Sequence, residues 1–197
     1  MSPSGTLSAK KIAILIAPRG TEECEFKVPK DAVEAAGAQV TVIGIDVAAV
    51  NTNNHDLDPG GTYNVDTAVK DACAKDFDGL IIPGGCVGAD KLRANADMVS
   101  FVRSFFEQKK PVGVICHGPW LLVEADVLQR RTVTSYASIR KDIENAGGSW
   151  VDREVVTDQG LVTSRRPDNL PAFCAKIIEE FAEGQHRQPA GSHVIDP

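Results

Sequence analysis

One cysteine carries the strongest chemical signal in the sequence. Cys116 follows the apolar run 111–115 and precedes His117 and Gly118, so it lies where a buried strand gives way to a helix. The start of that helix favours a thiolate, because its dipole is positive there. We therefore expect Cys116 to be a nucleophile rather than a core residue. Gly113 and Gly118 would relieve crowding if Cys116 has strained backbone angles.

His117 is a candidate general base, because an imidazole titrates near neutral pH and can accept a proton when a carboxylate orients it. Adjacent residues point to different sides of a helix start, so the sequence does not require its ring to contact the sulfur. The turn Pro83-Gly84-Gly85 allows backbone to approach a reacting atom without obstruction by a Cβ. We expect the N–H groups of Gly85 and His117 to form an oxyanion hole.

An acidic run, Thr21-Glu22-Glu23-Cys24-Glu25, follows the first apolar strand and is predicted to be a loop. One of its glutamates can turn inward and hydrogen-bond the Cys116 thiol. Burial would raise the pKa of that glutamate, which would then share a proton with the sulfur. Cys24 and Cys86 are expected at the same edge of the sheet as Cys116. They are candidates for second redox-active thiols, but buried or unreactive thiols are the favoured interpretation.

The elements that position these residues alternate along the chain. Apolar and β-branched runs predict strands at 11–17, 39–45, 79–82 and 111–115 and a hairpin of 154–156 with 161–164, whereas helical spacing predicts helices at 28–36, 66–74, 95–108, 117–125, 139–146 and 170–181. Residues 46–66 are expected to be a loop with one or two short edge strands. This order predicts an α/β fold, a doubly wound and mostly parallel sheet with helices on both faces, whose ligands bind beyond the carboxyl ends of the strands. We expect a flexible lead at 1–10, a single domain at 11–181 and an extended tail at 182–197.

Composition excludes several classes of function. A chain of 197 residues suits one domain, and its net charge of −6 argues against nucleic acid as the main partner. No apolar run approaches the roughly 20 residues that cross a bilayer, and the N-terminal segment lacks the apolar region of a secretory signal. Five cysteines without C-x-x-C spacing indicate neither a disulfide framework nor a zinc site, so a cytoplasmic location is expected. The histidines form no H-E-x-x-H motif and no nucleotide-binding glycine motif is present, so neither a metal nor a cofactor is predicted.

Together these motifs closely resemble the ThiJ/PfpI superfamily, in particular its PfpI-type intracellular proteases and stress proteins. The likeness covers about residues 11–181 and rests on segments 22–25, 82–85 and 114–119, with further matches at 134–136, 145–147, 150–152 and 164–165. The resemblance implies a flavodoxin-like sandwich that assembles as a dimer or larger ring.

The resemblance also implies roles for individual residues. Cys116 is the nucleophile, and a glutamate of the acidic run contacts it. Glu25 is the first choice by spacing and Glu22 the second. In PfpI-like proteins an acidic residue soon after Pro-Gly-Gly reaches the histidine of a neighbouring subunit. Asp90 is the matching position, although one residue is inserted before it and the acid is Asp rather than Glu.

The leading hypothesis for function is a stress-protective cysteine hydrolase that removes methylglyoxal or glyoxal adducts, a deglycase or glyoxalase-like activity without a cofactor. Two alternatives remain: an intracellular cysteine peptidase, and a non-enzymatic peroxide sensor or chaperone whose Cys116 sulfinate is held by Glu25. Glutamine amidotransferase domains need an H-x-E arrangement far downstream. None of His55, His186 and His193 has Glu two residues on, so this activity is excluded.

Overall fold

A seven-stranded sheet forms the centre of the computed structural model, which describes residues 5–185. Its strand order is β11-β12-β8-β7-β1-β3-β6, and every neighbouring pair is parallel except β11 with β12. The strands are β1 (Lys11–Leu15), β3 (Gln39–Gly44), β6 (Thr67–Ala68), β7 (Gly79–Ile82), β8 (Val112–Ile115), β11 (Val155–Asp158) and β12 (Leu161–Ser164). The predicted doubly wound, mostly parallel sheet is therefore confirmed.

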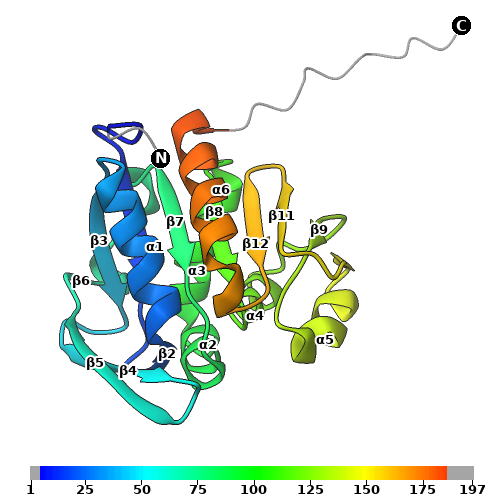
Figure 1. Ribbon diagram of the computed structural model, residues 1–197, viewed down its shortest axis with the longest axis horizontal. Helices are drawn as coiled ribbons and strands as arrows, with labels where there is room; N and C mark the ends of the chain where they lie inside the picture. The colour runs from blue at the N-terminus through cyan, green and yellow to red at the C-terminus, as the bar shows by residue number, and fades with distance from the viewer. Residues whose placement is uncertain (1–4, 186–197) are drawn as a thin grey trace, which may run out of the picture.

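Helices cover both faces of this sheet (Figure 1). On one face lie α1 (Glu23–Ala35) and α6 (Leu170–Glu183), side by side in front of the strands in Figure 1. The other face is covered by α2 (Cys86–Arg93), α3 (Ala96–Glu107), α4 (Pro119–Glu124) and α5 (Arg140–Asn145). The result is a three-layer sandwich with one apolar core on each side of the sheet.

The alternation of side chains along β1 explains why there are two cores. Ile12 and Ile14 pack on the α1 and α6 side, whereas Ala13 and Leu15 pack on the α3 side, and all four are fully buried. A Cβ on Gly113 in β8 would lie 2.5 Å from Cγ2 of Ile177 in α6. Gly113 thus allows α6 to pack closely, a different role from the relief of strain at Cys116 that we expected.

A second sheet lies beyond the carboxyl ends of the central strands. It consists of β2 (Arg19–Glu22), β4 (Ala49–Asn54) and β5 (Asp58–Asn64), in the order β2-β4-β5. The antiparallel β4–β5 hairpin occupies the segment predicted to be a loop with edge strands. A parallel pair, β9 (Thr132–Val133) with β10 (Ser149–Trp150), lies on the α5 side of the molecule.

The helix predicted at 66–74 is wrong. This segment contains β6 and the 3-10 turn η1 (Val69–Asp71), and a second such turn, η2 (Ala74–Asp76), follows. The Asp66 carboxylate accepts a hydrogen bond from the Val42 N–H at 2.8 Å, and the Asp66 N–H donates to the Val42 carbonyl at 3.0 Å. These two bonds hold the chain as an edge strand beside β3 instead of letting it coil into a helix.

Several boundaries also differ from the prediction. The first helix begins at Glu23 instead of Val28, so part of the acidic run is helical, and α2 begins directly after the Pro83-Gly84-Gly85 turn, where no helix was predicted. The last helix continues two residues beyond the predicted end at Phe181, and residues 186–197 of the predicted tail lie outside the described residues. In the expected flexible lead, Leu7 is fully buried and its N–H donates to the Ala36 carbonyl at 2.8 Å.

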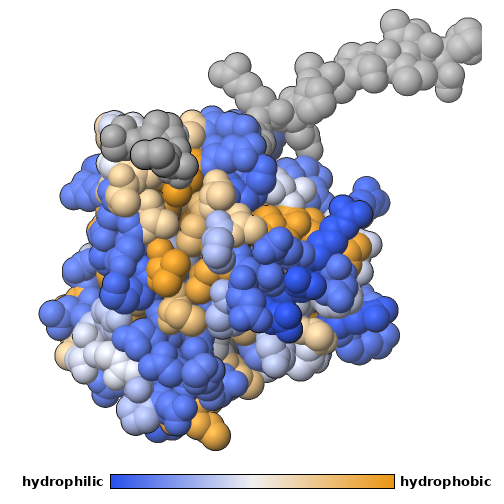
Figure 2. Space-filling model, viewed as in Figure 1, coloured by the Kyte–Doolittle hydropathy of each residue, from blue (hydrophilic) through white to orange (hydrophobic). Residues whose placement is uncertain are grey.

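The face shown in Figure 2 carries small apolar areas separated by hydrophilic residues. Exposed large hydrophobic residues are scattered, with Val28 on α1, Leu57 at the hairpin tip and Val87 on α2. Among residues 5–185, no helix is both long and apolar enough to cross a membrane.

Candidate active site

Cys116 occupies a strained turn between β8 and α4. Its φ of +62° lies in the left-handed region, which a non-glycine residue rarely adopts without support. Two hydrogen bonds supply this support: the Cys116 N–H donates to the Ser164 carbonyl at 3.0 Å, and its carbonyl accepts from the Tyr136 N–H at 2.9 Å. The Gly118 N–H closes the turn onto the Ile115 carbonyl at 2.9 Å. The side chain is therefore held in one place at the carboxyl edge of the sheet.

His117 contacts the sulfur directly. Its Nδ1 lies 3.2 Å from Sγ of Cys116, and its Nε2 lies 3.2 Å from Oγ of Ser138. If Nε2 carries the proton and donates to Ser138, Nδ1 is free to accept the thiol proton. Burial lowers the pKa of His117, which favours this neutral form. The ring stacks on Tyr136 with centroids 4.7 Å apart, so its orientation is fixed.

Glu25 approaches the sulfur from the first turn of α1. Its side chain is fully buried, and Oε2 accepts a hydrogen bond from the Gly84 N–H at 3.0 Å. The carboxyl interacts with the Cys116 thiol, although Oε1 makes no hydrogen bond of ordinary geometry. Burial raises the pKa of Glu25 to about 8, so it carries a proton at neutral pH. The structure thus places the first-choice glutamate beside the thiol.

Burial, and not the helix dipole, dominates the electrostatics of the thiol. Burial and the charge of Glu25 raise the pKa of Cys116 well above its usual value, while the N–H groups of Gly85 and His117 lower it. The expected preference for a thiolate is therefore outweighed in the single chain. When Glu25 holds its proton it is neutral, so it no longer raises the pKa of Cys116 through its charge. The thiol can then ionise by passing its proton to His117.

The two backbone N–H groups that were expected to form an oxyanion hole lie next to the sulfur. The N–H groups of Gly85 and His117 both interact with it. A Cβ on Gly84 would lie 2.6 Å from Oε2 of Glu25 and 2.7 Å from Cβ of Cys116, so this position requires glycine. Gly85 has a φ of +87° and aims its N–H into the site as α2 begins. The two donors can stabilise negative charge that develops next to the sulfur.

Glu22, the second-choice glutamate, has a different role. Its carboxylate accepts hydrogen bonds from the backbone N–H groups of His55 at 3.1 Å and Asp56 at 3.4 Å, and the Cys24 thiol lies 3.8 Å from Oε1. Glu22 therefore anchors the tip of the β4–β5 hairpin. Glu23 holds the same hairpin, because it accepts from the Tyr63 hydroxyl, the Gly61 N–H and the Asn54 amide.

Asp56 is a site residue that sequence reasoning missed. It lies at the hairpin tip, and its Oδ1 accepts the N–H of Cys86 at 3.1 Å, at the start of α2. Its negative charge reaches the site, since it raises the pKa of Glu25 and opposes the lowering of the pKa of His117. No motif marks Asp56, because it lies in a polar segment far along the chain from Cys116. Ser138, Tyr136 and Trp120 also surround His117 and were not identified from the sequence as site residues.

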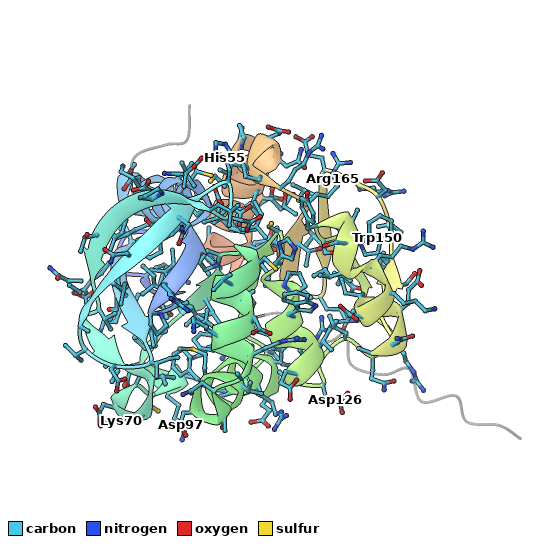
Figure 3. All side chains as sticks on the ribbon, turned by 90° about the horizontal axis from the view of Figure 1, so that it is seen from below. His55, Lys70, Asp97, Asp126, Trp150 and Arg165 are labelled. Carbon is cyan, nitrogen blue, oxygen red and sulfur yellow. The ribbon has the colours of Figure 1, made fainter. Side chains whose placement is uncertain are left out.

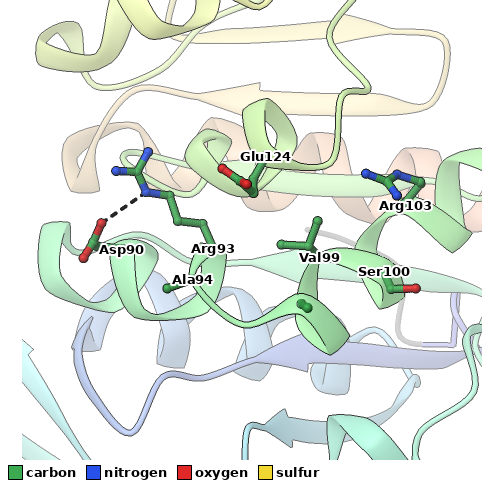
Figure 4. Close-up of a pocket in the computed structure, with 8 residues that line it drawn as sticks. Asp90, Arg93, Ala94, Val99, Ser100, Arg103 and Glu124 are labelled. Atoms are coloured by element: carbon green, nitrogen blue, oxygen red, sulfur yellow. Dashed lines mark hydrogen bonds and ion pairs between the residues drawn. The ribbon is translucent and has the colours of Figure 1, made fainter.

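Asp90 is not brought to Cys116 within one chain. It lies on α2, pairs with Nε of Arg93 at 3.1 Å, and lines an open cavity of about 670 Å³ between α2, α3 and α4 (Figure 4). Arg93 in turn lies over the Trp120 ring, with its guanidinium 4.5 Å from the centroid. The implied contact with the histidine of a neighbouring subunit stays a prediction.

Three of the other four thiols are poor candidates for a second reactive centre. All five cysteines are free, and burial raises the pKa of Cys24 to about 12 and that of Cys174 to about 11. Burial also raises the pKa of Cys86. Within residues 5–185, no group of three or more His, Cys, Asp or Glu side chains could hold a metal ion.

The fold is a flavodoxin-like α/β sandwich. Its cysteine lies in a strand-to-helix turn with left-handed backbone angles, beside a histidine and a buried glutamate. These features together define a class of α/β proteins with a reactive-site cysteine. The model of the DJ-1/PfpI family matches residues 10–180, and the chain belongs to this family. The ThiJ/PfpI resemblance of the sequence is thus confirmed.

Two relatives from Bacillus subtilis are each 43% identical over 165 residues. One is named "Putative cysteine protease YraA", and the match covers 84% of this chain and 94% of that protein. The other is general stress protein 18, with 83% and 93% covered. A crystal structure of a two-domain protein from Anabaena variabilis, with DJ-1/ThiJ/PfpI-like and ferritin-like domains, matches with a TM-score of 0.80 and 36% identity, covering 86% of this chain and 47% of that one.

Proposed function

We propose that this protein is a cytoplasmic, stress-protective cysteine hydrolase, active as a homo-oligomer, that removes methylglyoxal or glyoxal and their adducts without a cofactor. The observation that carries the proposal is the convergence on one sulfur of His117 at 3.2 Å, the buried Glu25 and two backbone N–H donors. General stress protein 18, at 43% identity, supports a protective role by its name.

The first step is addition of the Cys116 sulfur to the aldehyde carbon. His117 accepts the thiol proton at Nδ1, and the oxygen that gains negative charge lies near the N–H groups of Gly85 and His117. When the substrate is an adduct, its amine or thiol leaves with a proton. The product of this step is a hemithioacetal on Cys116.

The second step moves a proton between the two carbons of the adduct. A base removes the proton on the carbon bonded to sulfur, and the resulting enediolate is reprotonated at the neighbouring carbon, which gives a thioester. Both His117 and Glu25, whose pKa is about 8, can exchange protons near neutral pH. Water then hydrolyses the thioester and releases lactate or glycolate. The net reaction adds one water to the aldehyde, so it needs no external oxidant or reductant.

Peptide hydrolysis is the alternative that a specific comparison favours, because YraA carries the name of a cysteine protease. The same sulfur, histidine and backbone donors suit attack on a peptide carbonyl.

Parallel assays of the wild type and Cys116→Ala distinguish the two activities. Methylglyoxal and its arginine adduct test the leading proposal, and fluorescent casein tests the alternative. We expect Cys116-dependent release of lactate and no cleavage of casein. The absence of Cys116-dependent turnover of every substrate would exclude both enzymes. Intact-mass analysis after mild peroxide would then show whether oxygen adds selectively at Cys116, as a sensor requires.

A further inference from the structure

A second cavity lies directly beside the Cys116 elbow, on the side away from the hairpin. Its volume is about 350 Å³, within the range of sites for small molecules. The residues that give it chemical character are Ser135, Tyr136, Trp150, Asp152, Arg165 and Arg166. None of them is used in the chemistry proposed for the sulfur.

The backbone of Cys116 is hydrogen-bonded to Tyr136, which lines this cavity, and to Ser164, which precedes the lining residue Arg165. Its carbonyl accepts from the Tyr136 N–H at 2.9 Å, and its N–H donates to the carbonyl of Ser164, the residue before Arg165. The Tyr136 ring lines the cavity and also stacks on His117, with centroids 4.7 Å apart. The Tyr136 ring therefore lies between the cavity and His117, which places the cavity next to the reactive centre.

Arg165 is held in a defined position at the cavity. Its Nη1 donates to Oδ1 of Asp152 at 2.7 Å, and its Nε donates to Oδ1 of Asn169 at 3.1 Å. A guanidinium has five N–H donors, so these bonds fix the group while engaging only some of them. Arg166, which pairs with Asp168 at 3.2 Å, adds a second guanidinium that is half-exposed to solvent. The lining thus contains two positive side chains and one negative side chain.

The aromatic side of the cavity is equally fixed. Nε1 of Trp150 donates to Oγ of Ser135 at 3.0 Å, and the Arg140 guanidinium lies 5.2 Å from the centre of the Trp150 ring system. Figure 3 shows Trp150 and Arg165 on the same side of the molecule. Aromatic rings and guanidinium donors in one cavity suit an organic acid, whose carboxylate takes charge-assisted hydrogen bonds while its carbon part packs on the rings.

We propose that this cavity is a subsite of the Cys116 centre and binds a free carboxylate. The carboxylate belongs to an acylated amino acid or to a peptide C-terminus, and the same molecule carries the reactive carbonyl group. The inference rests on the proposed function and extends it: the protein distinguishes adducts on molecules with a free carboxylate from adducts on neutral ones. Arg166 supplies the accessible donors, and Arg165 with Asp152 sets the geometry.

The test uses two methylglyoxal hemithioacetals, one of N-acetylcysteine and one of N-acetylcysteinamide, which differ only in carboxylate against carboxamide. We expect the wild type to prefer the carboxylate by at least tenfold in kcat/KM and Arg166→Gln to lose most of that preference. Arg130→Gln, an exposed arginine in the turn after α4, should retain it. Equal kcat/KM of the wild type for both substrates would overturn the inference while leaving the proposed function intact.

Binding to Cys116→Ala separates the inference from the chemistry. By calorimetry, N-acetylglycine should bind at least tenfold more tightly than N-acetylglycinamide, and Arg166→Gln in the same background should abolish the difference. This result would support the subsite even if no substrate were turned over. Equal affinities for the two ligands would overturn the subsite.

Discussion

Nδ1 of His117 lies 3.2 Å from Sγ of Cys116, although the two residues are adjacent in the chain. Neighbouring side chains at a regular helix start point apart, but the φ of +62° at Cys116 alters the direction of its side chain relative to the ring. A base and a nucleophile are thereby paired within one turn of the chain, which contacts from Ser164 and Tyr136 hold in place. Contacts from more distant segments then decide how basic the ring is and how acidic the thiol is.

Replacing Glu25 should make the Cys116 thiol more acidic. The charge and hydrogen bond of Glu25 both raise the pKa of this thiol, so Glu25→Gln should shift the pH midpoint of Cys116 alkylation to a lower value. Iodoacetamide labelling followed by peptide mass spectrometry measures the midpoint for Cys116 separately from the other thiols. Glu34→Gln is the matched control, because Glu34 lies in an exposed ion pair with Lys30, and it should leave the Cys116 midpoint unchanged. Equal midpoints in the wild type and Glu25→Gln would contradict the assignment.

The same residue should make stability depend on pH. Burial raises the pKa of Glu25 from its usual 4.5 to about 8, so the folded state binds this proton more tightly than the unfolded chain does. The stabilisation is complete below about pH 4.5 and is lost as pH rises through about 8. Glu25→Gln stays neutral at both pH values. The difference between its urea-unfolding midpoint and that of the wild type should therefore be larger at pH 9 than at pH 6. Glu34→Gln, in an exposed ion pair with Lys30, should show no such difference.

Most of the central layer could be predicted from the sequence, because buried parallel strands are short apolar runs. The strand β7 and the elbow at Cys116 were found in this way, and Glu25 was selected by the spacing of the acidic run. The β4–β5 hairpin was not identified, because most of its residues are polar and Glu22 and Glu23 help to hold its strands, with only Val50 and Tyr63 packed on the core. The roles of Asp56 and Ser138 depend on contacts between distant segments, which local patterns do not encode.

Removing the Ser138 hydroxyl should weaken the base without abolishing it. Ser138 lies 3.2 Å from Nε2 of His117, and losing a neutral hydrogen bond of about 1 kcal/mol corresponds to roughly a fivefold fall in kcat/KM. His117→Ala should cost about 10²- to 10⁴-fold, as expected for loss of a general base. Ser100→Ala, on the exposed side of α3, is the control and should match the wild type. A larger loss in Ser138→Ala than in His117→Ala would argue against this order of roles.

Asp56→Asn should change the pH profile while keeping the hairpin in place. The asparagine Oδ1 can still accept the Cys86 N–H, but the negative charge that raises the pKa of His117 is gone. The acid limb of kcat/KM should therefore move to lower pH. Asp58→Asn provides the control on the same hairpin, because the Asp58 side chain is largely exposed and pairs with His55. Superimposable profiles for the wild type and Asp56→Asn would show that its charge does not act on the base.

Mixing experiments can decide whether Asp90 completes the site of a neighbouring subunit. Cys116→Ala and Asp90→Asn should each lower activity alone. In a mixed oligomer, an Asp90→Asn subunit supplies native Cys116 and His117, and a Cys116→Ala subunit supplies native Asp90 to the same site. For random exchange between dimers, half of the molecules are mixed and one of their two sites is complete, so about a quarter of wild-type activity should return. The control mixes Cys116→Ala with His117→Ala. These residues touch within one chain, so no complete site can form and no activity should return. If the Asp90 mixture also failed to recover, the ion pair with Arg93 would be the role of Asp90, and the site would be complete within a single chain.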